Sequence, residues 1–263
     1  MTPLRAASAA LRAGGLVAFP TDTVYGIGAL LGDAAAVRRL YALKGRAPGK
    51  PVAICVPTAD DIGCYARTCF GSGARARASG AALAALLPGP VTVVLERLPG
   101  LPAHLNTGHR LVGVRVPDHP LAVALAQQCG GALALSSANE SGATGAAGAP
   151  GSPQAFRALW PGLGAVLGED GALLHPAAGA AAAAAATSTT TAAATTTTTT
   201  AAAAAAAAAA APSPADGARP PQPPLPSTVV DLSVPGRYRV LRNGAQLQQT
   251  VATLDALGCL AMS

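Results

Sequence analysis

Residues 16–31 read L-V-A-F-P-T-D-T-V-Y-G-I-G-A-L-L, an apolar run that breaks at Pro20 and resumes at Ile27. Proline cannot donate a hydrogen bond to a strand ladder, so we expect a first buried strand to end at Phe19. A second short strand is predicted from Ile27 to Leu31. The polar residues between the two strands then form a turn.

Two groups of polar residues in this part of the chain are able to bind a ligand. The hydroxyl groups of Thr21 and Thr23 share one side of the turn and suit a small polar molecule, although they could equally cap the turn itself. The cations Lys44, Arg46 and Lys50 follow in a Gly/Pro-rich loop with no acid nearby in the chain. They could hold phosphate, whereas the alternatives are a helix C-terminus for Lys44 and plain solvation for Lys50.

Apolar runs of strand type alternate with segments of helical spacing along the chain, which predicts an α/β layered fold. Asp33 is expected to cap one helix and Gly45 to end it. Further helices are predicted at residues 3–13, 59–66, 81–87, 121–129, 153–160 and 246–257. Further strands are predicted at 16–19, 52–56, 91–95, 111–116, 132–136, 228–232 and 238–241, and 71–80 is predicted to be a loop.

Residues 177–224 differ in composition from the rest of the chain, with Ala and Thr tracts followed by a Pro-rich stretch. Such a segment cannot bury a core of its own, so we predict a disordered insertion. The main part of the domain is then 1–176, and 225–263 supplies C-terminal strands and a helix that complete the same domain.

The composition limits the kinds of partner and site. The 263 residues carry a net charge of +6, which suits an anionic ligand or a nucleic acid. The five cysteines form no C-x-x-C pair, and the histidines have no metal-ligand spacing, so we expect neither disulfides nor a protein-held metal. The longest apolar run, Ala201–Ala211, is too short to cross a bilayer. We expect a cytoplasmic protein, with a mitochondrial or other organellar location as the alternative because Met1–Arg12 is rich in Arg, Ala and Ser.

Several short motifs occur in one order along the chain and together resemble a known family. They are P-T-D-T-V-Y-G-I-G (20–28), A-L-K-G-R-A-P-G-K-P (42–51), L-P-G-P-V-T-V-V-L (87–95), V-G-V-R-V-P-D-H-P (112–120), S-S-A-N-E-S-G (136–142), S-T-V-V-D (227–231) and V-L-R-N-G-A (240–245). In this order they are similar to the YrdC-like family, the threonylcarbamoyl-AMP synthases.

The resemblance implies a fold and a reaction. The fold is an open, strongly twisted mixed sheet with flanking helices and a concave basic face. The reaction is that of a nucleotidyltransferase, which forms L-threonylcarbamoyladenylate and pyrophosphate from L-threonine, bicarbonate and ATP. Mg²⁺ would be carried on the phosphates, and a downstream tRNA threonylcarbamoyl-transferase machinery would modify adenosine. The competing hypothesis is a non-catalytic RNA-binding module that uses the basic face.

The resemblance also implies which residues form the nucleotide site. The K-x-R pair, Lys44 and Arg46, is assigned to catalysis. ATP binding is assigned to these two residues together with Lys50, Ser137, Asn139 and Arg242. Adenylate formation joins two anions, so cations and N–H donors around the phosphates fit this chemistry.

For the amino-acid substrate, the resemblance points to Thr23 and Ser227, and Arg115 suits its carboxylate because arginine binds carboxylates in a bidentate manner. The alternative for Arg115 is an ion pair with Asp118. Thr92 is expected to be structural. Cys55 stands where relatives often have histidine, which leaves its part in substrate contact open.

Overall fold

The computed structural model describes residues 1–45, 50–68, 73–140, 142, 149–176 and 224–262. Arg46 of the predicted nucleotide site and nearly all of the predicted insertion, 177–223, lie outside these residues. No helix in the described ranges has the length and apolar character needed to span a membrane.

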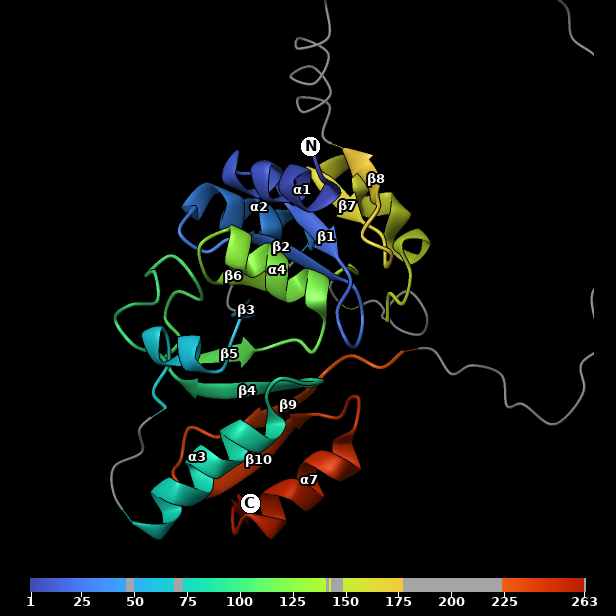
Figure 1. Cartoon of the computed structure of the whole chain (residues 1–263). Coiled ribbons are helices and arrows are strands. Elements are labelled where there is room, and N and C mark those ends of the chain that lie inside the picture. The colour runs from blue at the N-terminus through green and yellow to red at the C-terminus, as the bar shows by residue number, and fades with distance from the viewer. Residues whose placement is uncertain (46–49, 69–72, 141, 143–148, 177–223, 263) are drawn as a thin grey trace, which may run out of the picture.

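Helices and strands alternate as the sequence pattern predicts (Figure 1). The α-helices are α1 (Pro3–Arg12), α2 (Ala34–Leu43), α3 (Ala74–Leu86), α4 (Pro120–Gln128) and α7 (Leu247–Ala256), and the 3₁₀ helices are η1 (Asp60–Cys64) and η2 (Pro153–Gly162). The strands are β1 (Val17–Phe19), β2 (Gly26–Leu30), β3 (Ala53–Cys55), β4 (Val91–Glu96), β5 (Leu111–Arg115), β6 (Leu133–Ser137), β7 (Ala165–Leu167), β8 (Leu173–Pro176), β9 (Thr228–Asp231), β10 (Arg237–Arg242) and β11 (Leu260–Ala261).

The described strands form one mixed sheet, in agreement with the predicted fold class. Its order is β11-β10-β9-β4-β5-β3-β6-β2-β1-β7-β8. The central strand β3 pairs parallel with β5 and antiparallel with β6. The C-terminal strand β9 lies parallel beside β4, so the segment after the insertion completes the same sheet.

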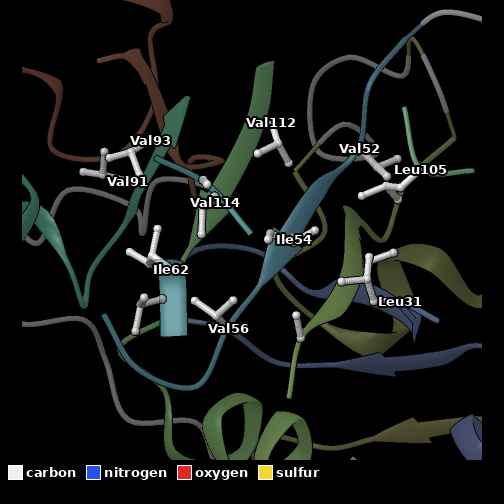
Figure 2. Close-up of a cluster of buried hydrophobic side chains, with 14 of the residues drawn as sticks. Leu31, Val52, Ile54, Val56, Ile62, Val91, Val93, Leu105, Val112 and Val114 are labelled. Atoms are coloured by element: carbon white, nitrogen blue, oxygen red, sulfur yellow. The ribbon is translucent and has the colours of Figure 1, made fainter. Parts of the chain in front are cut away.

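Side chains that alternate along the strands pack into a separate cluster on each face of the sheet. In β1, Val17 and Phe19 join a cluster with α1 and α4, whereas Ala18 joins a cluster with α2 and α3. The second cluster is the larger, and Figure 2 shows its centre, where Ile54, Val93 and Val114 from three neighbouring strands pack together.

The helices cover the two faces unequally, and this difference creates the site. The cluster beneath α1 and α4 contains residues of β1, β3, β6 and β7 but none of β4, β5 or β9. On the opposite face, by contrast, all of these strands are buried in the larger cluster. The face formed by β4, β5 and β9 on the α1/α4 side is therefore left open.

The start of α2 confirms the cap expected from the sequence. The Asp33 carboxylate accepts hydrogen bonds from the backbone N–H groups of Ala35 (2.8 Å) and Ala36 (2.9 Å). The bond from Ala36 is the main cause that lowers the pKa of Asp33 below its usual value. Gly45 follows the helix with φ +54°, a left-handed conformation that glycine adopts at low cost.

Some predicted elements were wrong. The expected loop at 71–80 instead contributes Ala74–Gly80 to α3, since alanine and arginine favour helices more than one glycine opposes them. The segment 59–66, predicted to be helical, does contain a helix, the short 3₁₀ helix η1. The strands β7, β8 and β11 were not predicted; pairing with β1, β7 and β10, respectively, defines them.

The strand order changes the expected effect of shortening the insertion. If 177–224 left and returned to one small region, as its place between motifs of one predicted site suggests, about eight residues would suffice as a link. However, β8 is an edge strand and β9 lies eight positions away in the order. At about 4.8 Å per strand, the distance from β8 to β9 across the sheet is up to roughly 38 Å. Eight extended residues reach only about 27 Å.

We therefore expect a deletion that leaves about 20 residues to fold and one that leaves about eight to unfold more easily. If 177–224 is flexible, the 20-residue link should gain roughly 0.8 kcal/mol of loop-closure free energy over the full segment. Thermal unfolding of the full chain and both deletions measures this. Unfolding of the 20-residue variant at a much lower temperature would show that the segment itself supports the fold.

Candidate active site

A cavity of about 400 Å³ lies on the open face of the sheet. Alternate residues of the central strands form its floor, among them Thr92 and Val94 of β4 and Gly113 and Arg115 of β5. Its walls come from the turn before β2, the ends of β3 and β6, and the C-terminal strands β9 and β10.

Glycine residues in the strands leave space for the cavity above this floor. A Cβ atom on Gly113 would lie 3.1 Å from the Thr92 side chain and 3.5 Å from that of Ala53. A Cβ atom on Gly26 would lie only 2.6 Å from Leu135 Cδ1. Glycine at these positions keeps neighbouring strands close while leaving space above the sheet.

At one end of the cavity, Arg115 is held by two residues of the 20–25 turn. Its Nη2 atom donates to Asp22 Oδ1 (2.5 Å) and to Thr23 Oγ1 (2.6 Å). The ion-pair partner is thus Asp22, whereas Asp118, the alternative considered from sequence, forms no such ion pair in the structure. Burial is the main cause that lowers the pKa of Arg115, and the charge of Asp22 opposes it.

The two threonines of the turn have different roles. Thr21 Oγ1 donates to the carbonyl of Val24 (2.7 Å) and accepts from the N–H of Thr23 (3.2 Å), so it caps the turn. Thr23 accepts the hydrogen bond of Arg115 and contacts the Thr21 hydroxyl at 3.2 Å. The structure thus brings the two residues predicted to bind threonine, Thr23 and Arg115, into direct contact.

Ser227 lies on the same cavity and links the floor to β10. Its Oγ atom is 2.8 Å from Thr92 Oγ1, and Arg242 Nη2 donates to both its Oγ (2.9 Å) and its carbonyl oxygen (2.8 Å). Thr92, expected to be purely structural, also lines the cavity. The sequence could have shown this, because Thr92 and Val94 are two residues apart in a predicted strand and so point to the same face.

Lys44 meets the S-x-N motif, Ser137 to Asn139, beside the start of β2, where Ser137 pairs with Gly26. Lys44 is 1% exposed, and its ammonium group donates to the carbonyl oxygens of Ser137 (2.5 Å) and Asn139 and to Asn139 Oδ1 (3.1 Å). The Ser137 hydroxyl donates to the same amide oxygen. Because an ammonium group has three N–H donors, contact between Lys44 and a phosphate requires one of these bonds to be exchanged.

The remaining predicted cation, Lys50, is exposed and precedes Pro51, which lines the cavity. Arg46 falls in the undescribed range 46–49. His109, in the loop before β5, lines the cavity. Arg97 holds the loop before it through hydrogen bonds to carbonyl oxygens of Leu101, Pro102, Leu105, Asn106 and His109.

Cys55 belongs to the core beneath α1 and α4 and does not line the cavity. Burial raises the pKa of its thiol to about 12. Cys55, whose part in substrate contact the sequence left open, is therefore a packing residue in this chain. Among the described residues, no group of three or more His, Cys, Asp or Glu side chains could hold a metal ion.

The Sua5/YciO/YrdC family model, which is described as telomere recombination, matches residues 9–158. The chain belongs to this family. The C-terminal strands β9 and β10, which supply Ser227 and Arg242, lie beyond the matched residues.

Relatives named threonylcarbamoyl-AMP synthase extend the similarity over nearly the whole chain. Threonylcarbamoyl-AMP synthase from Homo sapiens is 37% identical over 252 residues, which cover 96% of this chain and 71% of that protein. The Mus musculus enzyme is 36% identical over 96% of this chain and 70% of its own length. Threonylcarbamoyl-AMP synthase from Alkalilimnicola ehrlichii is 39% identical over 139 residues, which cover 53% of this chain and 69% of that protein.

Solved structures of the family share the fold. Sua5 from P. abyssi, complexed with L-threonine, has a TM-score of 0.66 at 23% identity and is matched over 98% of this chain. The chain spans 58% of the length of that protein. YciO from E. coli has a TM-score of 0.62 at 18% identity, with 92% of this chain and 89% of YciO covered.

Proposed function

We propose that this chain is a threonylcarbamoyl-AMP synthase, which forms L-threonylcarbamoyladenylate and pyrophosphate from L-threonine, bicarbonate and ATP. The observation that carries the proposal is the convergence of Arg115, Ser137, Ser227 and Arg242 on one cavity. Mammalian enzymes of that name align over 96% of the chain, which includes all of these residues.

Arg115, Thr23 and Ser227 form the proposed L-threonine end. A buried guanidinium group favours a carboxylate ligand, since its planar N–H groups match the carboxylate oxygens and little water competes. The hydroxyl groups of Thr23 and Ser227 can donate to or accept from a small polar substrate. The neutral threonine amine would bond to the carbon of bicarbonate and lose a proton, while a C–O bond of bicarbonate breaks and water leaves, which gives a carbamate.

The ATP end is assigned to Lys44, Arg46, Lys50, Ser137, Asn139 and Arg242. In the adenylation step, a carbamate oxygen bonds to the α-phosphorus while the bond to the leaving pyrophosphate oxygen breaks. Negative charge on the phosphates must be balanced in this step, and arginine, lysine and hydroxyl donors supply that balance. Lys44 supports the site by holding the Ser137–Asn139 turn.

Mg²⁺ is proposed to arrive on the phosphates of ATP. The polar side chains that line the cavity carry hydroxyl, imidazole and guanidinium groups, and the carboxylate of Asp22 is already paired with Arg115. This donor set does not form a magnesium cage, whereas Mg²⁺ bound to phosphate oxygens keeps several water ligands. The ion would supply charge neutralisation for the leaving pyrophosphate.

Arg46→Ala and Lys50→Ala are each expected to weaken ATP binding by about tenfold or more, since a charge-assisted contact contributes roughly 1.5–3 kcal/mol. Calorimetric titration with a non-hydrolysable ATP analogue measures the affinity. Arg38→Ala, which removes an exposed cation of α2, is the matched control. Wild-type affinity in both loop variants would remove the 44–50 loop from the proposed nucleotide site.

Isotopic labelling tests the reaction itself. With ¹³C-bicarbonate, ATP and L-threonine, mass spectrometry should detect an adenylate that carries the labelled carbon. The competing RNA-binding hypothesis predicts nucleic-acid affinity without this product. Transfer to tRNA by a downstream enzyme remains a prediction from the family resemblance, and a cytoplasmic location, with a mitochondrial or other organellar one as the alternative, remains a prediction from the sequence.

A further inference from the structure

Asp22 is a nearly buried acid to which the proposed chemistry has so far given no role. Its side chain is 11% exposed and that of its partner Arg115 is 6% exposed. The ion pair joins the 20–25 turn to β5, two segments that lie far apart in the sequence. It therefore ties the wall of the cavity to its floor at the proposed threonine end.

The contacts of Arg115 leave one guanidinium nitrogen for a ligand. Nη2 is engaged by Asp22 and Thr23. Nε is fully buried and makes no hydrogen bond to the described residues, so it does not reach the cavity. Since Arg115 lines the cavity, Nη1 is the atom that can meet a bound carboxylate.

We propose that Asp22 is a positioning residue that holds Arg115 with Nη1 toward the cavity and selects an amino acid over a simple carboxylic acid. The inference rests on the proposed function, because it takes L-threonine as the ligand. The selection follows from charge: Asp22 and Arg115 together are neutral, so a carboxylate that docks on Arg115 leaves one net negative charge. An ammonium group on the same ligand offsets that charge.

The second oxygen of Asp22 supports an electrostatic role. Asp22 Oδ2 is buried and accepts no hydrogen bond from the described residues. A buried carboxylate oxygen without a hydrogen bond costs free energy unless nearby positive charge stabilises it. The positive charge of Arg115 balances part of the negative charge of Asp22. A cationic group on a ligand beside Arg115 would balance more of it.

The test compares Asp22→Asn with Asp231→Asn. Asp231 is a second buried acid with an arginine partner, Arg239, at 3.3 Å on β9 and β10, and it does not line the cavity. Asp22→Asn should weaken L-threonine binding by about tenfold and leave ATP affinity within about twofold, since a charge-assisted bond to Arg115 is lost. Asp231→Asn should change neither affinity.

Calorimetric titration with L-threonine needs no turnover, so it tests the proposed function and the proposed role of Asp22 separately. No threonine binding by the wild-type chain would overturn the proposed function and this inference together. Wild-type binding that is unchanged in Asp22→Asn, or an equal loss of ATP and threonine affinity, would overturn the inference alone.

A second measurement uses the wild-type chain and is independent of how well the variant folds. L-threonine should bind at least about tenfold more tightly than 2,3-dihydroxybutanoate of the same stereochemistry, which replaces the amine by a hydroxyl. Equal affinities for the two ligands would show that the charge of Asp22 does not select the amino group, and the inference would fail.

Discussion

Arg115→Ala is expected to weaken L-threonine binding by about 10- to 150-fold, because a hydrogen bond to a charged group contributes roughly 1.5–3 kcal/mol. The same change leaves the carboxylate of Asp22 without its partner at 11% exposure. Removal of one member of a buried ion pair typically costs about 3–5 kcal/mol of stability. Threonine titration and thermal unfolding measure the two effects separately.

A double variant separates binding from stability at this site. Asp22→Ala in the Arg115→Ala background removes the unpaired carboxylate, so part of the lost stability should return while threonine affinity stays low. Thr23→Val keeps the side-chain shape and removes a hydroxyl partner of Arg115, so its loss of threonine affinity should be smaller. Equal losses of threonine and ATP affinity in these variants would contradict the division of the cavity into two ends.

Lys44→Met is expected to lower the unfolding temperature by about 4–8 °C and to weaken ATP binding by about tenfold or more. Methionine retains the length of the side chain but gives no donor to the carbonyl oxygens of Ser137 and Asn139. The S-x-N turn would lose the group that fixes it beside the cavity. Thermal unfolding and titration with an ATP analogue measure both effects.

Arg38→Met is the control for Lys44→Met, since it removes an exposed cation from the same helix. It should leave the unfolding temperature and the ATP affinity almost unchanged. If Lys44→Met behaved like this control, the contacts between Lys44 and the S-x-N turn would be irrelevant both to stability and to nucleotide binding.

Much of the fold could be predicted from local patterns. The break at Pro20 between β1 and β2, the Asp33 cap and the strands β4 to β6 follow from periodicity and from short-range hydrogen bonds. The short strand β7 could not be predicted in this way, because it is defined by its pairing with β1, far away in the sequence. Tertiary contact decides such elements.

Residues of the cavity show the same limit. Sequence reasoning considered Asp118 as the partner of Arg115 because it is three residues away, whereas the actual partner, Asp22, is 93 residues away. The turn that carries Asp22 reaches Arg115 only because the sheet places β5 within its range. Thr92 could have been found from strand alternation, but nothing in the sequence near His109 indicates that its loop borders the cavity.

The assignment of the chain as an adenylate-forming enzyme is tested most directly by pyrophosphate release from ATP, with L-threonine and bicarbonate omitted in turn. The account predicts release that requires both compounds and that falls sharply in Arg115→Ala. Release at an undiminished rate without threonine and bicarbonate, or none at all with every substrate present, would contradict it.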